Sequence, residues 1–451
     1  MTVSIHNSSP VLSRWQPYPE YKDSSIKWLG EIPSHWEVKR LRRVFKVING
    51  STPKTSESAY WDGDINWITP DDLGQLQTDT IVSSSRKITE KGYRSCGVSL
   101  VPAGSLVLST RAPIGHLGIA GVALCTNQGC RSLVFQCHGD TRFFYYHLVV
   151  ARPELQSWGQ GATFTELSKT RLEEIYLVFP DEIEQRAIST FLDRETARID
   201  RLIAAKERLI ALLQEKRAAL ISHAVTKGLD PNVPMKDSGV EWLGEIPAHW
   251  EVKRLKHLGK AIIGLTYSPS DVTNNADDTL VLRASNVKDG NLAFEDAVYV
   301  NSQIPAEILT REGDILICSR SGSRSLIGKN ARIDGAGIGV TFGAFMTIFR
   351  SVYNMYLSYV FNSSLFEQQS GSFMTSTINQ LTVSTLNNIQ VPFPPRNEQW
   401  AIAIQLENEL RKIDAIVTAT QTAIIHLREY RSALITAAVT GKIDVRKELE
   451  A

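Results

Sequence analysis

Two sets of an aspartate, a glutamate and a lysine stand at matching spacings in this 451-residue chain. They are Asp23, Glu37 and Lys39 in the first set, and Asp237, Glu251 and Lys253 in the second. Two carboxylates beside an amine can hold Mg²⁺ for the cleavage of a phosphodiester. One hypothesis is therefore a duplicated magnesium-dependent nuclease. The alternative is that the segment around each set, which is short, aromatic and amphipathic, is a docking element.

Other motifs of catalysis and metal binding are incomplete in the sequence. Residues 322–330 read GSRSLIGKN, with five residues between the glycines and no hydroxyl residue after Lys329, which excludes a phosphate loop. The five cysteines are odd in number and irregular in spacing, which argues against a disulfide framework. Cys125 and Cys130, with His116 and His138, are a conceivable metal site, but lone cysteines are usually small buried apolar residues. We expect no metal and no catalytic residue in this chain.

The composition is that of a folded protein without a dominant charge. Apolar residues make up 43% and charged residues 22%, and 49 basic residues face 48 acidic ones. A net charge of +1 excludes a uniformly basic DNA coat, so any nucleic-acid contact must come from local patches. The first twenty residues hold no apolar signal segment, and no apolar run reaches the ~18 residues of a membrane span. We therefore expect a cytoplasmic protein without membrane contact.

The chain contains the same segment twice. Residues 22–41 and 236–255 share 16 of 20 positions at an offset of 214, and the pattern Phe-Pro, then Glu-Gln, recurs from Phe179 and Phe393 at that offset. The regions between the matches, 42–176 and 256–390, have diverged almost completely. This pattern favours a common task for the matched segments and different tasks for the divergent ones. The alternative is a gene duplication whose middle regions drifted without constraint.

A long helix is predicted in each half, over 181–227 and 395–441. Proline precedes each helix, and Gly228 and Gly441 mark their ends. Apolar residues recur along both in steps of three and four, as in the seam of a coiled coil. The seam residues are Ile188, Leu192, Ile199, Leu202 and Leu213, and in the second half Ile402, Leu406, Ile413, Ile416 and Leu427. Two equivalent stripes in one chain suggest that the helices pack on each other, in an orientation that the spacing leaves open.

The divergent regions read as loop-rich mixed domains. Their short apolar segments are rich in Val, Ile and Phe and are separated by Gly and Pro. The predicted parts are an N-terminal extension 1–21, domains 22–180 and 236–394, helices 181–227 and 395–441, a linker 228–235 and a tail 442–451. Basic clusters follow both copies of the repeat, and they are either solvated faces or phosphate-contacting surfaces. From these clusters we take Arg40, Arg43 and Arg254 as candidate DNA contacts.

The repeated segment KDSGVEWLGEIPAHWEVKRL, its partner from Lys22, and the two Phe-Pro…Glu-Gln helix starts resemble the specificity subunit of type I restriction–modification systems. The resemblance covers essentially the whole chain. It implies an α+β fold class: two loop-rich, mixed α/β target-recognition domains alternate with two long helices that pair as an antiparallel coiled coil. The internal repeat would be pseudo-twofold.

The same resemblance implies the function and the partners. The chain would bind double-stranded DNA at a bipartite target, with one half-site for each recognition domain and the helices as a spacer. Two methyltransferase subunits would dock on the helices at the seam residues named above, and motor–nuclease (restriction) subunits would join for cleavage. S-adenosylmethionine, ATP and Mg²⁺ would belong to those subunits, leaving this chain without a cofactor. A duplicated coiled-coil scaffold with no nucleic-acid role remains a further hypothesis.

Base readout requires Arg, Asn, Gln, Ser or Thr side chains presented on loops. The candidates of the first domain are Arg111, Asn127, Gln128, Thr163 and Thr165. Those of the second domain are Ser319, Arg320, Ser321, Arg324, Asn379 and Gln380. Among these candidates we favour Arg111 and Arg320 as base contacts, because each comes just after an apolar strand-like segment.

Overall fold

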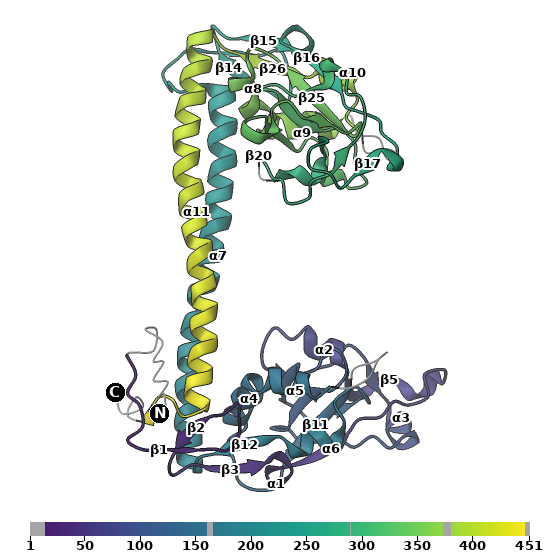
Figure 1. Cartoon of the computed structure of the whole chain (residues 1–451), viewed down its shortest axis with the longest axis vertical. Helices are drawn as coiled ribbons and strands as arrows, with labels where there is room; N and C mark the ends of the chain where they lie inside the picture. Colours follow the sequence, from purple (N-terminus) through teal and green to yellow (C-terminus); the bar gives the residue numbers. More distant parts are fainter. Residues whose placement is uncertain (1–13, 160–165, 289, 373–379, 447–451) are drawn as a thin grey trace. The chain divides into compact units, whose positions relative to one another are not determined.

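The two long helices lie where the sequence predicts them. In the computed structural model α7 runs over Glu182–Lys227 and α11 over Arg396–Val439 (Figure 1). The structure describes residues 14–159, 166–288, 290–372 and 380–446. The shared Glu-Gln motif has a structural task at each start, because the side-chain amides of Gln185 and Gln399 donate to the carbonyls of Pro180 and Pro394, both at 2.8 Å.

The chain divides into two compact units, and each unit takes part of both long helices. Unit 1 is Met1–Ala205 with Ala423–Ala451, and unit 2 is Lys206–Thr422. The first recognition domain therefore belongs with the beginning of α7 and the end of α11. The second recognition domain belongs with the end of α7 and the beginning of α11.

Within unit 1 the two helix segments run antiparallel. Glu184, at the start of α7, lies 3.9 Å from Arg446 beyond the end of α11, and Asp200 further along α7 pairs with Arg431 at 2.9 Å. Ile188 of α7 is buried in the same core as the C-terminal part of α11, where Leu434 is fully enclosed. The partner residue moves backwards along α11 as α7 advances, which defines the antiparallel pairing.

Within unit 2 the same arrangement recurs at the offset of 214 residues. Arg217 of α7 forms an ion pair with Asp414 of α11, and these two residues are the repeat equivalents of Arg431 and Asp200. Apolar residues from both helices share one core, among them Ile221, Val225, Ile402, Leu406 and Ile413. The antiparallel coiled-coil pairing and the internal repeat expected from the resemblance are thereby confirmed.

The seam differs from its prediction at one equivalent position in each helix. Leu202 and Ile416 are 46% and 47% exposed, whereas their neighbours Ile203 and Val417 pack against the cores. After Ile199 the observed seam continues four residues on, at Ile203. The prediction took a step of three, to Leu202, which lies off the seam. The remaining predicted seam residues are buried or half-buried: Ile188, Leu192, Ile199, Leu213, Ile402, Leu406, Ile413 and Leu427.

The repeated segment packs against the end of a long helix in each unit. In unit 1 β1 (Tyr21–Asp23) pairs antiparallel with β2 (Glu31–Pro33), and the fully buried Trp36 packs in the core with the C-terminal residues of α11. In unit 2 β13 (Met235–Asp237) pairs with β14 (Glu245–Pro247), and Trp250 packs with the end of α7. The shared task of the matched sequence is therefore to join the end of one helix to the start of the other.

A five-stranded sheet forms the centre of the first recognition domain. Its order is β4-β11-β8-β9-β6, and the β6–β9 pair is parallel. The strands are β4 Phe45–Asn49, β11 Cys130–Phe135, β8 Leu106–Ser109, β9 Leu117–Ala120 and β6 Thr80–Ile81. A second sheet joins β10 Cys125–Thr126, β5 Trp61–Ile68 and β7 Lys87–Ile88 in that order. The helices are α1 Leu41–Val44, α2 Pro70–Gly74, α3 Glu90–Ser95, α4 Thr141–Val150, α5 Arg152–Ser157 and α6 Lys169–Glu174.

The second recognition domain repeats this strand order although its sequence has diverged. Its central sheet is β16-β25-β22-β23: β16 Lys260–Ile263, β25 Met346–Arg350, β22 Ile315–Cys318 and β23 Asn330–Arg332. The parallel pair β18–β24 matches β5–β10 in a sheet of β17 Val272–Thr273, β21 Tyr299–Val300, β18 Thr279–Leu282 and β24 Thr341–Phe342. A short hairpin joins β19 Val287–Lys288 to β20 Asn291–Leu292. The helices are α8 Asn354–Phe361, α9 Ser364–Ser372 and α10 Val383–Asn388.

Each recognition domain begins and ends on one antiparallel strand pair. In unit 1 β3 (Glu37–Arg40) pairs with β12 (Tyr176–Phe179), and in unit 2 β15 (Glu251–Arg254) pairs with β26 (Gln390–Phe393). The chain therefore enters and leaves each domain side by side.

Among the described residues, no helix is long and apolar enough to cross a membrane.

One buried histidine makes the stability of unit 1 depend on pH. His147 of α4 is fully buried, with Trp28 and Phe143 at 5.5 and 6.2 Å between ring centroids. Burial away from water lowers the pKa of His147 to about 4. In the unfolded chain a histidine titrates near ~6.5, so between these values the unfolded state binds a proton that the folded state does not.

We expect the free energy of unfolding to fall as the pH is lowered from ~6.5 towards 4, by up to ~1.4 kcal/mol per pH unit from this group. Urea unfolding of the full chain at several pH values measures this slope. His147→Phe should reduce the slope, whereas His426→Gln, at an exposed position of α11, should leave it unchanged. An unchanged slope in His147→Phe would exclude His147 as the cause.

Candidate nucleic-acid interface

Three loops of the first recognition domain meet at the end of β8. The backbone N–H groups of Thr110 and Arg111 donate to the carbonyl of Gly129, at 2.8 and 3.3 Å, and the N–H of Leu167 donates to the carbonyl of Thr110 at 2.8 Å. Arg111 and Glu166 also form an isolated antiparallel bridge. These bonds fix the loop after β8 against the β10–β11 loop and against the segment that begins at Glu166. We call this hydrogen-bonded arrangement of three segments the loop frame.

A carboxylate joins two arginines in this frame. Nε of Arg111 donates to Oε2 of Glu166 at 3.0 Å, and Nη2 of Arg131 donates to Oε1 of the same residue at 3.3 Å. Arg131 extends from β11 and is largely buried, so its charge requires a partner. Arg111 is exposed beside it. Glu166 therefore neutralises a buried arginine and orients an exposed one.

The other described candidates of the first domain lie in the same frame. The amide oxygen of Gln128 accepts a hydrogen bond from the Thr52 hydroxyl, and Oδ1 of Asn127 accepts from the N–H of Gly129 at 2.9 Å. Asn127 is half-buried and shapes its own loop, whereas Gln128 is exposed. The structure thus brings Arg111, Asn127 and Gln128 together from two loops. Thr163 and Thr165 lie outside the described residues.

The second recognition domain has an equivalent frame at the end of β22. The N–H groups of Ser319 and Arg320 both donate to the carbonyl of Phe345 at 3.0 Å, and the N–H of Leu381 donates to the carbonyl of Ser319 at 2.8 Å. Arg320 and Gln380 form the isolated bridge that corresponds to Arg111 and Glu166. Arg320 therefore occupies the position of Arg111, and Phe345 occupies that of Gly129.

The side chains around Arg320 differ from those around Arg111. The guanidinium of Arg320 lies over the ring of Phe345, 5.3 Å from its centroid. Ser319 is buried and donates its hydroxyl to the carbonyl of Phe345 at 3.0 Å, so it supports the backbone of this frame. The hydroxyl of Ser321 accepts from the N–H of Ser323 at 3.2 Å. Arg324 is exposed at the start of a short 3₁₀ turn, and Asn379 lies outside the described residues.

The candidate phosphate contacts occupy different surroundings. Nη1 of Arg40 pairs with Oε2 of Glu174 at 2.6 Å and its Nε donates to the hydroxyl of Tyr176 at 3.2 Å, so Arg40 holds α6 to β12. Arg43 and Arg254 are exposed, and neither forms an ion pair with another residue of the described ranges. These two arginines are therefore available to an anionic partner.

The repeated acidic residues serve local structure. Lys39 pairs with Glu37 at 2.8 Å, and its hydrogen bond lowers the pKa of that carboxyl; Lys253 does the same for Glu251. Asp23 and Asp237 accept backbone N–H groups in the turns of their hairpins. No group of three or more His, Cys, Asp or Glu side chains suited to a metal ion occurs in the part of the chain that the structure describes. These contacts give no support to a duplicated nuclease.

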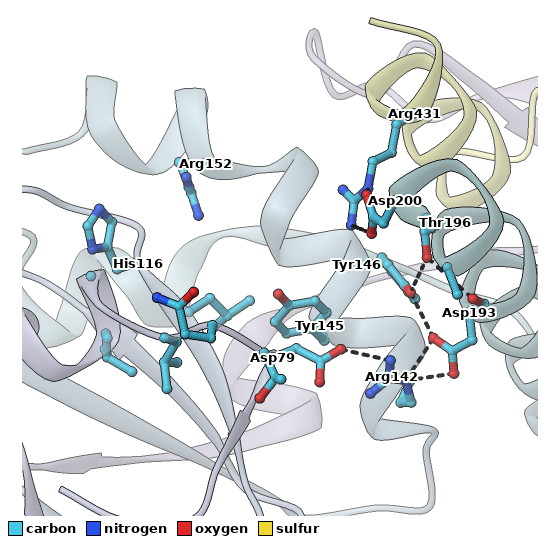
Figure 2. A pocket seen from close by; sticks show the side chains of 17 residues that line it. Asp79, His116, Arg142, Tyr145, Tyr146, Arg152, Asp193, Thr196, Asp200 and Arg431 are labelled. Carbon is cyan, nitrogen blue, oxygen red and sulfur yellow. Dashed lines mark hydrogen bonds and ion pairs between the residues drawn. The ribbon is translucent and has the colours of Figure 1, made fainter. Parts of the chain in front are cut away.

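A polar pocket of about 520 Å³ lies in unit 1, where the recognition domain meets α7 (Figure 2). Arg142 of α4 bridges Asp79 and Asp193 at 2.7 Å each, and the hydroxyl of Tyr146 donates to Asp193 at 2.7 Å. Burial opposes the charge of Arg142, but its bonds to Asp193 and Asp79 outweigh burial and raise its pKa. This network anchors the recognition domain to the helix within the unit.

Several residues of the two loop frames were not among the sequence candidates. Glu166, Gly129 and Phe345 complete the two frames, and Arg131 shares the carboxylate of Glu166. One signal in the sequence could have indicated part of this set: Glu166 and Gln380 stand at the repeat offset of 214, directly before the matched residues Leu167 and Leu381. The pairing of Phe345 with Arg320 has no such signal.

The fold and the repeated sequence define a class of proteins with two similar domains joined by paired long helices. The family described as type I restriction modification DNA specificity domain matches residues 33–212 and 247–424. The chain belongs to this family of specificity subunits, which are the non-catalytic subunits of type I restriction–modification systems.

Curated relatives agree with this assignment, and solved structures share the fold. The type I restriction enzyme MjaIX specificity subunit of Methanocaldococcus jannaschii is 28% identical over 97% of this chain and 99% of its own length. The EcoKI specificity subunit of Escherichia coli is 27% identical over 44% of each chain. A chain from a structure of type I R-M complex assembly has a TM-score of 0.71 at 15% identity, covering 90% of this chain and 98% of its own. The HsdS subunit of Thermoanaerobacter tengcongensis has a TM-score of 0.54, covering 91% and 98%.

Proposed function

We propose that this chain binds a bipartite double-stranded DNA target, with one half-site read by each recognition domain. The observation that carries the proposal is the loop frame that occurs twice. Both frames present an arginine after the equivalent strand, Arg111 after β8 and Arg320 after β22, in the same backbone hydrogen-bonding pattern. The side chains around the two arginines differ, so two copies of one fold would read different base sequences.

Two methyltransferase subunits would dock on the paired helices, and motor–nuclease subunits would join them for cleavage. Large apolar side chains remain exposed on both long helices, at Ile183, Leu202, Leu209, Leu212, Trp400, Ile404, Ile416 and Ile425. The buried seam residues are occupied by packing within each unit, so docking falls to the exposed set. S-adenosylmethionine, ATP and Mg²⁺ would be bound by the partner subunits.

The methylated-site map of the assembled complex tests this function. The chain is purified with its methyltransferase subunits and incubated with S-adenosylmethionine and DNA of diverse sequence. We expect two specified blocks of bases separated by a gap of fixed length and free sequence. The methyltransferase subunits without this chain serve as the control. One uninterrupted block, or methylation independent of this chain, would contradict the proposal.

A further inference from the structure

The two recognition domains use one backbone frame with three coupled differences in side chains. The strand registers align Ser109 with Cys318 and Cys130 with Met346, so the equivalences follow residue by residue. Gly129 corresponds to Phe345, Arg131 to Thr347 and Glu166 to Gln380. The first frame is therefore charged around its arginine, and the second frame is neutral and carries an aromatic ring.

In the first frame the carboxylate of Glu166 neutralises the buried charge of Arg131. The side chain of Arg131 is only 11% exposed and pairs with Glu166, which also holds Nε of Arg111. In the second frame Thr347 replaces the buried arginine and is itself buried. Once that charge is absent, a carboxylate at position 380 has no buried partner to neutralise, which explains why a neutral glutamine suffices there.

Arg320 is consequently held in a different way from Arg111. Among the described residues no carboxylate lies within ion-pair distance of Arg320, and its guanidinium lies over the ring of Phe345, 5.3 Å from the centroid. Phe345 is 59% exposed, although a phenyl ring gains free energy by leaving water. A guanidinium held over an aromatic face uses none of its N–H donors in that contact. The pair thus presents a planar donor group and an exposed apolar surface side by side.

We propose that Phe345 and Arg320 are the specificity-determining pair of the second recognition domain, an inference that rests on the proposed function. Arg320 donates to O6 and N7 of a guanine in the major groove, and Phe345 packs on the 5-methyl group of a neighbouring thymine. The first domain has Gly129 in place of Phe345, so it lacks this contact. The second half-site accordingly contains a guanine beside a thymine.

Substitution of Phe345 separates this role from general DNA affinity. The complex of Phe345→Ala with the methyltransferase subunits is mapped for methylated sites beside the wild-type complex. We expect the preference for the thymine to fall by about tenfold, while the first half-site and the guanine stay unchanged. Arg320→Lys keeps the charge but loses the bidentate geometry, so it should weaken the preference for the guanine. Phe345→Leu retains an apolar contact and should keep part of the thymine preference.

Val352→Ala is the matched control. Val352 lies beyond the opposite end of β25 and is 76% exposed, so its loss should change neither half-site. Thermal unfolding of each variant should match the wild type, because all three side chains are exposed. A wild-type complex without a bipartite motif would refute the proposed function itself. A wild-type bipartite motif that Phe345→Ala and Arg320→Lys leave unchanged would overturn the inference alone.

Discussion

Gly441→Ala should destabilise the protein by about 2–5 kcal/mol, whereas Gly228→Ala, after the other long helix, should cost about 1–2 kcal/mol. Both glycines follow long helices and have positive φ angles, +71° at Gly441 and +77° at Gly228. An alanine in this left-handed conformation costs about 1–2 kcal/mol at either site. This part of the expected loss is shared by the two variants.

The difference between the two variants arises from the repeated Glu-Ile-Pro segment. A Cβ at Gly441 would lie 2.3 Å from Cδ of Pro33 and 3.1 Å from the Trp36 ring, so the proline ring has to move. A Cβ at Gly228 would meet the Trp250 ring at 3.3 Å and Pro247 at 3.8 Å, which small shifts accommodate. Forced overpacking of this kind typically adds about 1–3 kcal/mol.

Urea unfolding of the full chain and its two glycine variants measures the comparison. Each glycine belongs to a different unit, Gly441 to the unit of Trp36 and Gly228 to the unit of Trp250, so the two losses are compared from the unfolding of the whole chain. Equal losses of stability in the two variants would show that the close approach of Pro33 to Gly441 has no energetic consequence.

The long helices were predictable because their signals are local. The predicted spans 181–227 and 395–441 agree with Glu182–Lys227 and Arg396–Val439 within two residues. Proline, a Glu-Gln pair and a terminal glycine act within one or two turns of the chain. The predicted seam departs from the observed one after Ile199, because a step of three and a step of four both lead to an apolar residue, Leu202 or Ile203.

The recognition domains were predictable only as a class. Their strands follow one order, yet the pairing of β8 with β11 or of β22 with β25 joins residues far apart in sequence. The loop candidates Arg111 and Arg320 were chosen because a polar residue after an apolar strand is a local signal, and the structure places both in equivalent backbone positions. Phe345 was not among the candidates because its contact with Arg320 depends on strand register, which the diverged sequences do not reveal. Glu166 is signalled only by the neighbouring match of Leu167 with Leu381.

Replacement of residues 42–176 by the equivalent segment of another family member should exchange one half-site completely. The segment starts and ends beside the β3–β12 pair, where Arg40 lies opposite Tyr176. An exchange there leaves the repeated segment and both long helices intact, so the graft alters the first recognition domain alone. The reciprocal exchange of 256–390 begins and ends beside β15 and β26, where Arg254 lies opposite Gln390.

The most direct test of independent half-site reading is the methylated-site map of these two chimaeras in complex with the methyltransferase subunits. We expect each chimaera to change one half of the target and to retain the other half of the wild-type motif. A chimaera that alters both halves, or one that folds, assembles and keeps the wild-type target, would contradict a one-to-one assignment of domains to half-sites.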